Sequence, residues 1–276
     1  MQSPILSLQN LRVSFPGANG PVEAVRGVSF ELGREKLGIV GESGSGKSMT
    51  GRALLRLSPP AARVSADRLM LGDVDLLRAS ERQMNQIRGR RMGLIMQDPK
   101  YSLNPVVCVG EQVAEAYRIH TRCKSSVARE RAIAMLEAVQ IRDPQRVYKM
   151  YPHEMSGGMG QRIMIAMMLV SEPEVLIADE ATSALDVTVR LEILQLLDDL
   201  VHKRGLGLIF ISHDLNLVRR FCDRVIIMFR GRIVESLRAA ELADAEHPYT
   251  RGLLASMPRI HAPQRRLQVL SRDANW

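Results

Sequence analysis

The chain has 276 residues, of which 46% are apolar and 25% charged, an ordinary balance for a soluble globular protein with a sizeable core. Its net charge of +8 suits a polyanionic partner such as a nucleic acid, a membrane surface or a nucleotide, and equally a solvated surface rich in arginine. The charge forms no long basic stripe with interleaved aromatic residues, which disfavours nucleic acid as the partner.

The first part of the chain predicts strands around a Gly-rich loop. Alternation places Leu11, Val13 and Phe15 on one face of a strand, and the same period resumes over residues 28–32. The apolar run at 37–40 predicts a buried strand that leads directly into the loop. Residues 49–57 then predict a helix that ends before Pro59, and residues 61–92 are polar and mixed.

The rest of the chain alternates helices with buried strands. Apolar runs at 92–96, 175–178, 208–211 and 225–228 predict buried strands, and residues 232–235 predict an edge strand. Residues 98–160 look mainly helical, and an apolar stripe over residues 189–201 predicts an amphipathic helix. This order predicts an α/β fold with a mostly parallel sheet flanked by helices.

The three cysteines are far apart and form no CxxC pair, which argues against a disulfide scaffold or a zinc site and fits reduced thiols in the cytosol. The N-terminus lacks the basic start and apolar core of a signal peptide. The strongest apolar run after residue 160, residues 163–170, is too short to cross a bilayer. Work at a membrane would therefore require docking on other subunits.

The loop after the strand at 37–40 matches the phosphate-binding pattern GxxxxGK[ST]. Its glycines let successive backbone N–H groups point at phosphate oxygens, and the following helix N-terminus adds positive potential. Lys47 is expected to reach the β- and γ-phosphates, and Ser48 to bind Mg²⁺. The alternative is a Gly-rich turn with an unrelated lysine, but the strand–loop–helix context favours the phosphate site. We expect nucleotide contacts from Gly41, Ser43, Gly44, Ser45, Gly46, Lys47, Ser48 and Met49.

The buried strand at 175–178 leads into two acids. Paired carboxylates at such a strand end are costly unless a cation or a base role compensates, although solvated acids at a strand end are also common. Together with the phosphate loop upstream, the pair indicates that Asp179 holds Mg²⁺ through water and that Glu180 activates the attacking water.

With the segment Met155-Ser156-Gly157-Gly158-Met159-Gly160-Gln161-Arg162, the sequence resembles the ABC ATPase family from about residue 5 to about residue 258. The segment is similar to the family's LSGGQ signature, with Met155 in place of Leu and Met159 in place of Gln. The resemblance implies that Ser156, Gly157 and Gly158 touch the γ-phosphate of an ATP molecule held by the opposite subunit. Loss of the Gln side chain at Met159 removes any polar contact that it makes, while the backbone donors remain.

The resemblance assigns roles to further residues. It implies that Phe15 lies under the adenine ring, that Gln97 senses Mg²⁺ and the water, and that His213 contacts the γ-phosphate. For Phe15 the alternative is a core strand residue, and for His213 a structural histidine. Residues 183–186 match the D-loop, which crosses the dimer interface. The catalytic set is then Glu180, His213, Lys47 and Gln97, and the Mg²⁺ set is Ser48, Gln97 and Asp179.

The family's organisation implies an ATPase domain over residues 1–258 with an N-terminal antiparallel β subdomain and a helical subdomain at about 98–165, followed by a short basic tail at 259–276. ATP and Mg²⁺ are the implied cofactors. The implied partners are two transmembrane permeases, a sister ATPase subunit in a heterodimer or a homodimer, and indirectly an extracytoplasmic solute-binding protein, with no nucleic acid. The implied place is the cytoplasmic face of the inner membrane, held there peripherally.

Two segments narrow the subfamily. Residues 98–105 resemble the Q-loop of peptide and nickel importers, and residues 247–254 resemble their C-terminal segment, interpreted as a subgroup marker and not as a site. The absence of a C-terminal cysteine cluster tilts the expectation toward nickel, metal chelates or other small solutes over peptides. The alternatives are an ABC-type ATPase of nucleic-acid maintenance and a non-hydrolysing regulatory module. The interval between phosphate loop and signature has no heptads and no cysteine pairs, and Lys47, Asp179, Glu180 and His213 are all present.

Overall fold

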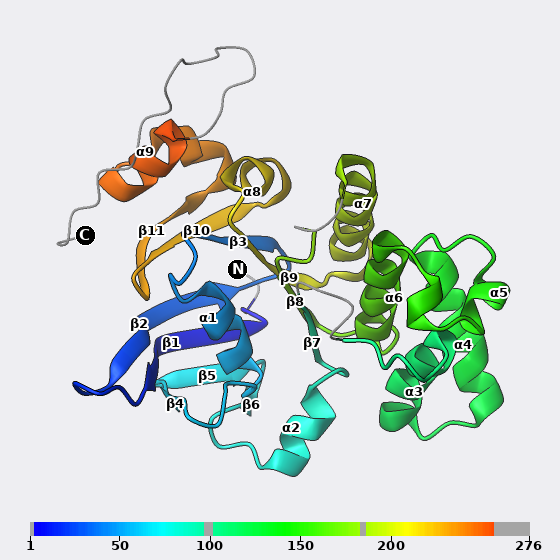
Figure 1. Cartoon of the computed structure of the whole chain (residues 1–276). Coiled ribbons are helices and arrows are strands. Elements are labelled where there is room, and N and C mark those ends of the chain that lie inside the picture. The colour runs from blue at the N-terminus through cyan, green and yellow to red at the C-terminus, as the bar shows by residue number, and fades with distance from the viewer. Residues whose placement is uncertain (1–2, 97–101, 183–185, 257–276) are drawn as a thin grey trace. The chain divides into compact units, whose positions relative to one another are not determined.

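The computed structural model describes residues 3–96, 102–182 and 186–256 (Figure 1). The chain divides into two compact units. One consists mainly of residues 78–209, and the other mainly of residues 4–77 together with the chain from residue 210 onward.

In the unit that holds residues 4–77, an antiparallel sheet is built around strand β1 (Leu6–Phe15). Strand β2 (Val22–Leu32) pairs with it on one side, and β4 (Arg63–Ser65) and β5 (Arg68–Leu71) pair with it as well. Strand β6 (Val74–Asp75) adds to β5. Leu11 and Val13 are fully buried while Arg12 is exposed, which confirms the predicted alternation and the antiparallel N-terminal sheet.

The same unit holds one part of a second, mostly parallel sheet. Strand β3 (Lys36–Val40), buried throughout, pairs in parallel with β10 (Arg224–Phe229), which pairs antiparallel with the edge strand β11 (Arg232–Arg238). Strand β9 (Gly207–Ser212) lies on the other side of β3. The helical elements of this unit are α1 (Lys47–Leu54), α8 (Leu215–Phe221), η3 (Ala239–Asp244) and α9 (Pro248–Ala255).

In the unit of residues 78–209, strand β7 (Met92–Ile95) pairs in parallel with β8 (Val175–Asp179), and β9, which crosses the unit boundary, follows β8. Helix α6 contacts β7, and helices α3, α4 and α5 gather on the side of α6 away from the strands (Figure 1). The helical elements are α2 (Glu81–Ile87), α3 (Val109–Thr121), α4 (Ser125–Ala138), α5 (Pro144–Tyr148), η2 (Pro152–Glu154), α6 (Gly157–Leu169) and α7 (Val187–Arg204).

The predicted apolar strands are all present, and so is the amphipathic helix over residues 189–201, whose stripe from Ile193 to Val201 is buried. Helix α1 differs from its predicted bounds. It begins at Lys47, directly after the left-handed Gly46, and ends at Leu54 because Arg56 adopts a positive φ of 54°. No helix among the described residues is long and apolar enough to span a membrane.

Residues 61–92 contain structure that the sequence did not suggest. Strands β4, β5 and β6 are two to four residues long, too short for a period of two to stand out. Helix α2 did carry a signal: Ser80 accepts a hydrogen bond from Gln83 N, and the Gln83 side chain accepts one from Ser80 N, as in a capping box.

Candidate functional site

The phosphate loop connects β3 to α1, and two of its glycines allow it to lie in close contact with neighbouring backbone. A Cβ atom on Gly41 would lie 2.1 Å from the carbonyl oxygen of Met228, and one on Gly46 would lie 2.5 Å from that of Ala24. Gly46 also has a φ of 98°, which side chains disfavour. At Gly44, which has a φ of 79°, a Cβ atom would meet nothing within 4 Å, so glycine is needed here only for the left-handed backbone conformation.

Lys47 places its charge inside the curve of this loop. The residue is 5% exposed, and its ammonium donates to Gly41 O at 2.7 Å and to Glu42 O at 2.8 Å. The first turn of α1 contains no acidic residue, so the helix N-terminus and the lysine add potential of the same sign. The combination of a buried ammonium, curled backbone and helix N-terminus fits a phosphate group.

The other predicted residues of this unit lie in the first turn of α1, at the end of β1 and after β9. Ser48 and Met49 are half-buried in the first turn of α1. Phe15, at the end of β1, is half-buried rather than enclosed in the core. His213 follows β9 in an exposed turn before α8, where Asp214 caps the helix by accepting from Leu217 N at 3.0 Å.

The two acids lie in the other unit, at the end of β8. Asp179 is 8% exposed and ends a strand that is buried throughout. Glu180 is half-buried and has a φ of 50°, in the left-handed region that residues with a Cβ rarely occupy. Such strained backbone is common at functional sites. This conformation was not predicted, and no sequence pattern signals it.

The signature residues open helix α6 in the same unit as the acids. Ser156 caps the helix, and its hydroxyl accepts from Met159 N at 3.4 Å. Ser156 and Gly157 are exposed, and a Cβ atom on Gly157 would meet nothing within 4 Å. A Cβ atom on Gly158 would lie 3.0 Å from Val189, so this glycine permits close approach to α7. The exposed helix start is therefore accessible to an anion.

The structure thus groups the predicted site residues by unit. The phosphate loop, Phe15 and His213 belong to one unit, and Asp179, Glu180 and residues 156–158 belong to the other. Gln97 and residues 183–185 lie outside the described residues. Asp186, the last residue of the predicted D-loop, caps α7 by accepting from Val189 N at 3.0 Å.

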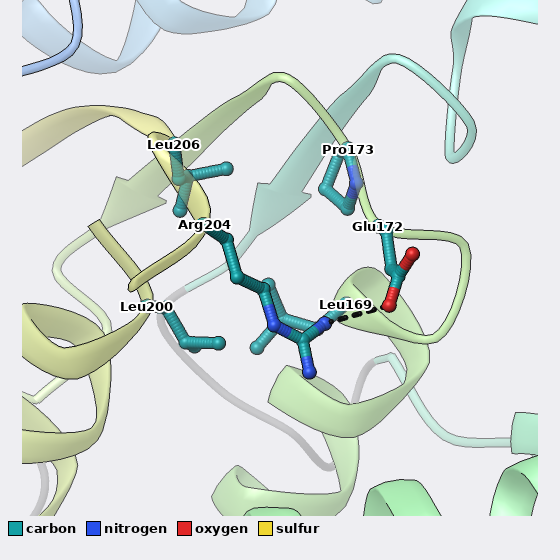
Figure 2. A pocket seen from close by; sticks show the side chains of 6 residues that line it. All are labelled: Leu169, Glu172, Pro173, Leu200, Arg204 and Leu206. Atoms are coloured by element: carbon teal, nitrogen blue, oxygen red, sulfur yellow. Dashed lines mark hydrogen bonds and ion pairs between the residues drawn. The ribbon is translucent and has the colours of Figure 1, made fainter. Parts of the chain in front are cut away.

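A cavity of about 360 Å³ lies elsewhere in the unit of residues 78–209 (Figure 2). Arg204 reaches across it to Glu172, with which it forms an ion pair of 3.1 Å. A hydrogen bond from Arg131 holds the pKa of Glu172 below its usual value. None of the predicted site residues lines this cavity, so it is not the candidate site. The lining residues are Leu169, Glu172, Pro173, Leu200, Arg204 and Leu206.

Solved structures of similar fold include ATP-binding cassettes. A dimeric cassette in a post-hydrolysis state, bound to ADP and Pi, superposes with a TM-score of 0.76 and 25% identity over 85% of this chain and 98% of that chain. CbiO1 from Clostridium perfringens, described as part of an ABC transporter complex, gives a TM-score of 0.74 at 25% identity, over 88% of this chain and 92% of that one. These neighbours confirm the predicted ABC ATPase fold.

Curated relatives are more similar in sequence. The dipeptide transport ATP-binding protein DppD of Bacillus subtilis is 46% identical over 93% of this chain and 77% of its own length. The oligopeptide transport ATP-binding protein OppD of the same organism is 45% identical over 94% of this chain and 73% of its own length. The glutathione import ATP-binding protein GsiA of Escherichia coli is 45% identical over 94% of this chain and 43% of its own length.

The ABC transporter family model matches residues 25–183, which is more than half of the chain. This span includes the phosphate loop, the helix start at Ser156 and the acids at the end of β8. The chain therefore belongs to the ABC transporter family, as one of its ATP-binding, ATP-hydrolysing subunits.

Proposed function

We propose that this subunit hydrolyses ATP to power an ABC importer for peptides or a related small solute. The observation that carries the proposal is the buried ammonium of Lys47, which donates to the carbonyl oxygens of Gly41 and Glu42 within the Gly-rich loop at the start of α1. The relatives reported above are ATP-binding proteins of dipeptide transport, oligopeptide transport and glutathione import. They favour a peptide-type solute over the nickel or metal chelates that the sequence also allowed, and they lend no support to nucleic-acid maintenance.

In the proposed reaction the phosphate loop binds the triphosphate through its N–H groups, and Lys47 neutralises the β- and γ-phosphates. Phe15 contacts the adenine ring. Ser48 and Asp179 would hold Mg²⁺, together with Gln97, because hydroxyl and carboxylate oxygens suit this cation. Bound there, Mg²⁺ would neutralise charge on the phosphate oxygens.

Hydrolysis needs a water molecule aligned with the γ-phosphate. Glu180 is the proposed base that orients this water and takes its proton, and His213 contacts the γ-phosphate. Ser156, Gly157 and Gly158 of a second ATPase subunit would close over the same phosphate with the donors of a helix N-terminus. Each nucleotide would then lie between two subunits, and ATP binding and hydrolysis would close and open the pair.

The proposed partners are two permeases and a sister ATPase subunit, at the cytoplasmic face of the inner membrane. The segment from Gln97 to about Gln161 is the proposed permease contact. Support comes from apolar side chains that this segment exposes, among them Val106 at 79% and Ile119 at 65%. Exposed apolar side chains are candidates for burial at a protein interface.

The experiment that tests this function is Glu180→Gln, measured as ATP turnover and ATP binding. The amide keeps the size of the side chain but cannot take a proton, so turnover should fall at least about a hundredfold while ATP affinity is retained. Glu174→Gln is the control, since Glu174 is an exposed glutamate paired with Arg91 near the start of β8. Unchanged turnover in Glu180→Gln would remove this residue from the role of base.

A further inference from the structure

The C-terminal segment that the sequence marks only as a subgroup feature reaches the phosphate loop. Tyr249, in the first turn of α9, is fully buried, and the centroid of its ring lies 4.4 Å from the ring centroid of Phe229 at the end of β10. A buried tyrosine hydroxyl requires a hydrogen-bond partner. Here the partner is the backbone of Glu42, whose N–H donates to the Tyr249 hydroxyl at 3.1 Å. The two residues are 207 positions apart in the chain.

The backbone of Glu42 accepts and donates hydrogen bonds that fix the conformation of the loop. Its carbonyl oxygen accepts from the Lys47 ammonium at 2.8 Å and from Ser45 N at 3.1 Å. Its N–H is held by Tyr249 on the other side. The peptide group between Gly41 and Glu42 is thus fixed by Tyr249, and the one between Glu42 and Ser43 is fixed by Lys47 and Ser45. Any rotation of the first peptide moves the carbonyl of Gly41, which is the second acceptor of Lys47, at 2.7 Å.

The tyrosine is itself held in place by the turn that precedes α9. His247 caps the helix, and its Nδ1 accepts from Tyr249 N at 3.2 Å. One carboxylate oxygen of Glu235, on β11, accepts from Glu246 N at 2.8 Å and from His247 N at 3.3 Å. Pro248 fixes φ at the first helical position. The hydroxyl is therefore presented to the loop by a segment tied to the sheet.

We propose that Tyr249 is a positioning residue for ATP binding: its hydroxyl holds the Glu42 peptide and so sets the position of the Lys47 ammonium and of the loop backbone. The proposal rests on the proposed function of the loop. Since this contact acts on binding in the ground state and the transition state alike, its loss should raise KM and leave kcat nearly unchanged.

The test is Tyr249→Phe, which keeps the ring against Phe229 and removes only the hydroxyl. KM for ATP, and the dissociation constant of a fluorescent ATP analogue, should rise about fivefold, the equivalent of one hydrogen bond, with kcat within about twofold of wild type. Tyr148→Phe is the matched control. It also removes a buried hydroxyl, one that donates to Glu111 at 2.8 Å in the other unit, and it should leave ATP affinity unchanged.

Two further measurements separate positioning from a general loss of stability. Glu42→Pro removes the N–H from the loop side, so in that background Tyr249→Phe should have no further effect on KM; a persisting fivefold effect would overturn the proposal. Amide exchange followed by NMR needs no ATP: the Glu42 amide should exchange slowly in wild type and at least about fivefold faster in Tyr249→Phe.

An equal exchange rate of the Glu42 amide in the two proteins would overturn the contact itself. Equal KM values in Tyr249→Phe and wild type would overturn the positioning role while leaving the ATPase function intact. Failure of wild type to bind ATP would instead count against the proposed function, and amide exchange would still decide whether Tyr249 holds Glu42.

Discussion

Two glycines of the phosphate loop, Gly44 and Gly46, allow the cost of a left-handed backbone to be measured separately from the cost of a steric clash. Gly44 and Gly46 both have positive φ values, 79° and 98°. In either place an alanine incurs the cost of a left-handed conformation, about 1–2 kcal/mol. At Gly46 the new Cβ atom would also lie 2.5 Å from the backbone oxygen of Ala24 on β2, whereas at Gly44 it would meet nothing within 4 Å.

The crowding at Gly46 involves backbone on both sides, so relief requires the loop or β2 to move. Overpacking of this kind costs about 1–3 kcal/mol. Gly46→Ala should therefore destabilise the unit that holds the loop by roughly 2–5 kcal/mol, and Gly44→Ala by about 1–2 kcal/mol. With a urea m-value of about 2 kcal/mol/M, the two unfolding midpoints should differ by roughly 0.5–1.5 M.

The assay is urea unfolding without nucleotide, with both variants and wild type measured side by side. Equal m-values in the three proteins would show that the midpoints report stability alone. Coincident midpoints for Gly44→Ala and Gly46→Ala would rule out the expected crowding at Gly46, because they would mean that the contact with Ala24 relaxes at no cost. A lower midpoint for Gly44→Ala would refute it as well.

The remaining predictions concern the unit of residues 78–209. A Cβ atom on Gly110 would lie 2.1 Å from the ring of Tyr148, so Gly110→Ala should lower stability by about 1–3 kcal/mol and the melting temperature by several degrees, measured by calorimetry; an unchanged melting temperature would contradict the packing of α3 on α5. The Arg131 hydrogen bond lowers the pKa of Glu172 from its usual 4.5. The stabilisation is complete above that value and is lost as the pH falls through the lower, folded pKa. Glu172→Gln should thus be less stable than wild type at pH 7, with a deficit that shrinks below about pH 4.5 in urea titrations; a deficit independent of pH would refute the linkage.

Local sequence was sufficient for the parts of the fold and site that depend on near neighbours. The strand over residues 175–179 is buried throughout, and a buried strand is recognisable in sequence as a short apolar run. The phosphate loop is recognisable from the fixed spacing between its glycines and Lys47. Strands of two to four residues between 63 and 75 have too few positions for a period to be seen.

Features that depend on distant parts of the chain were not accessible from sequence. The left-handed backbone of Glu180 is imposed by its surroundings, since glutamate has no preference for it. The contact between Tyr249 and Glu42 spans 207 positions, and local periodicity carries no information about such a pair. The roles of all the predicted site residues, Gln97 included, stay predictions, and so do the boundaries of the helical subdomain and the tail.

ATP is proposed to bind to residues 41–48 and to be hydrolysed with the help of the acids at the end of β8. The decisive measurement is a crystal structure of the Glu180→Gln variant with ATP and Mg²⁺. We expect the triphosphate on the N–H groups of the phosphate loop, with Lys47 at the β- and γ-phosphates. Asp179 and residue 180 should face the γ-phosphate, and Ser156 of a second subunit should lie opposite. A nucleotide bound away from this loop, or acids remote from its γ-phosphate, would show that the proposed site is wrong.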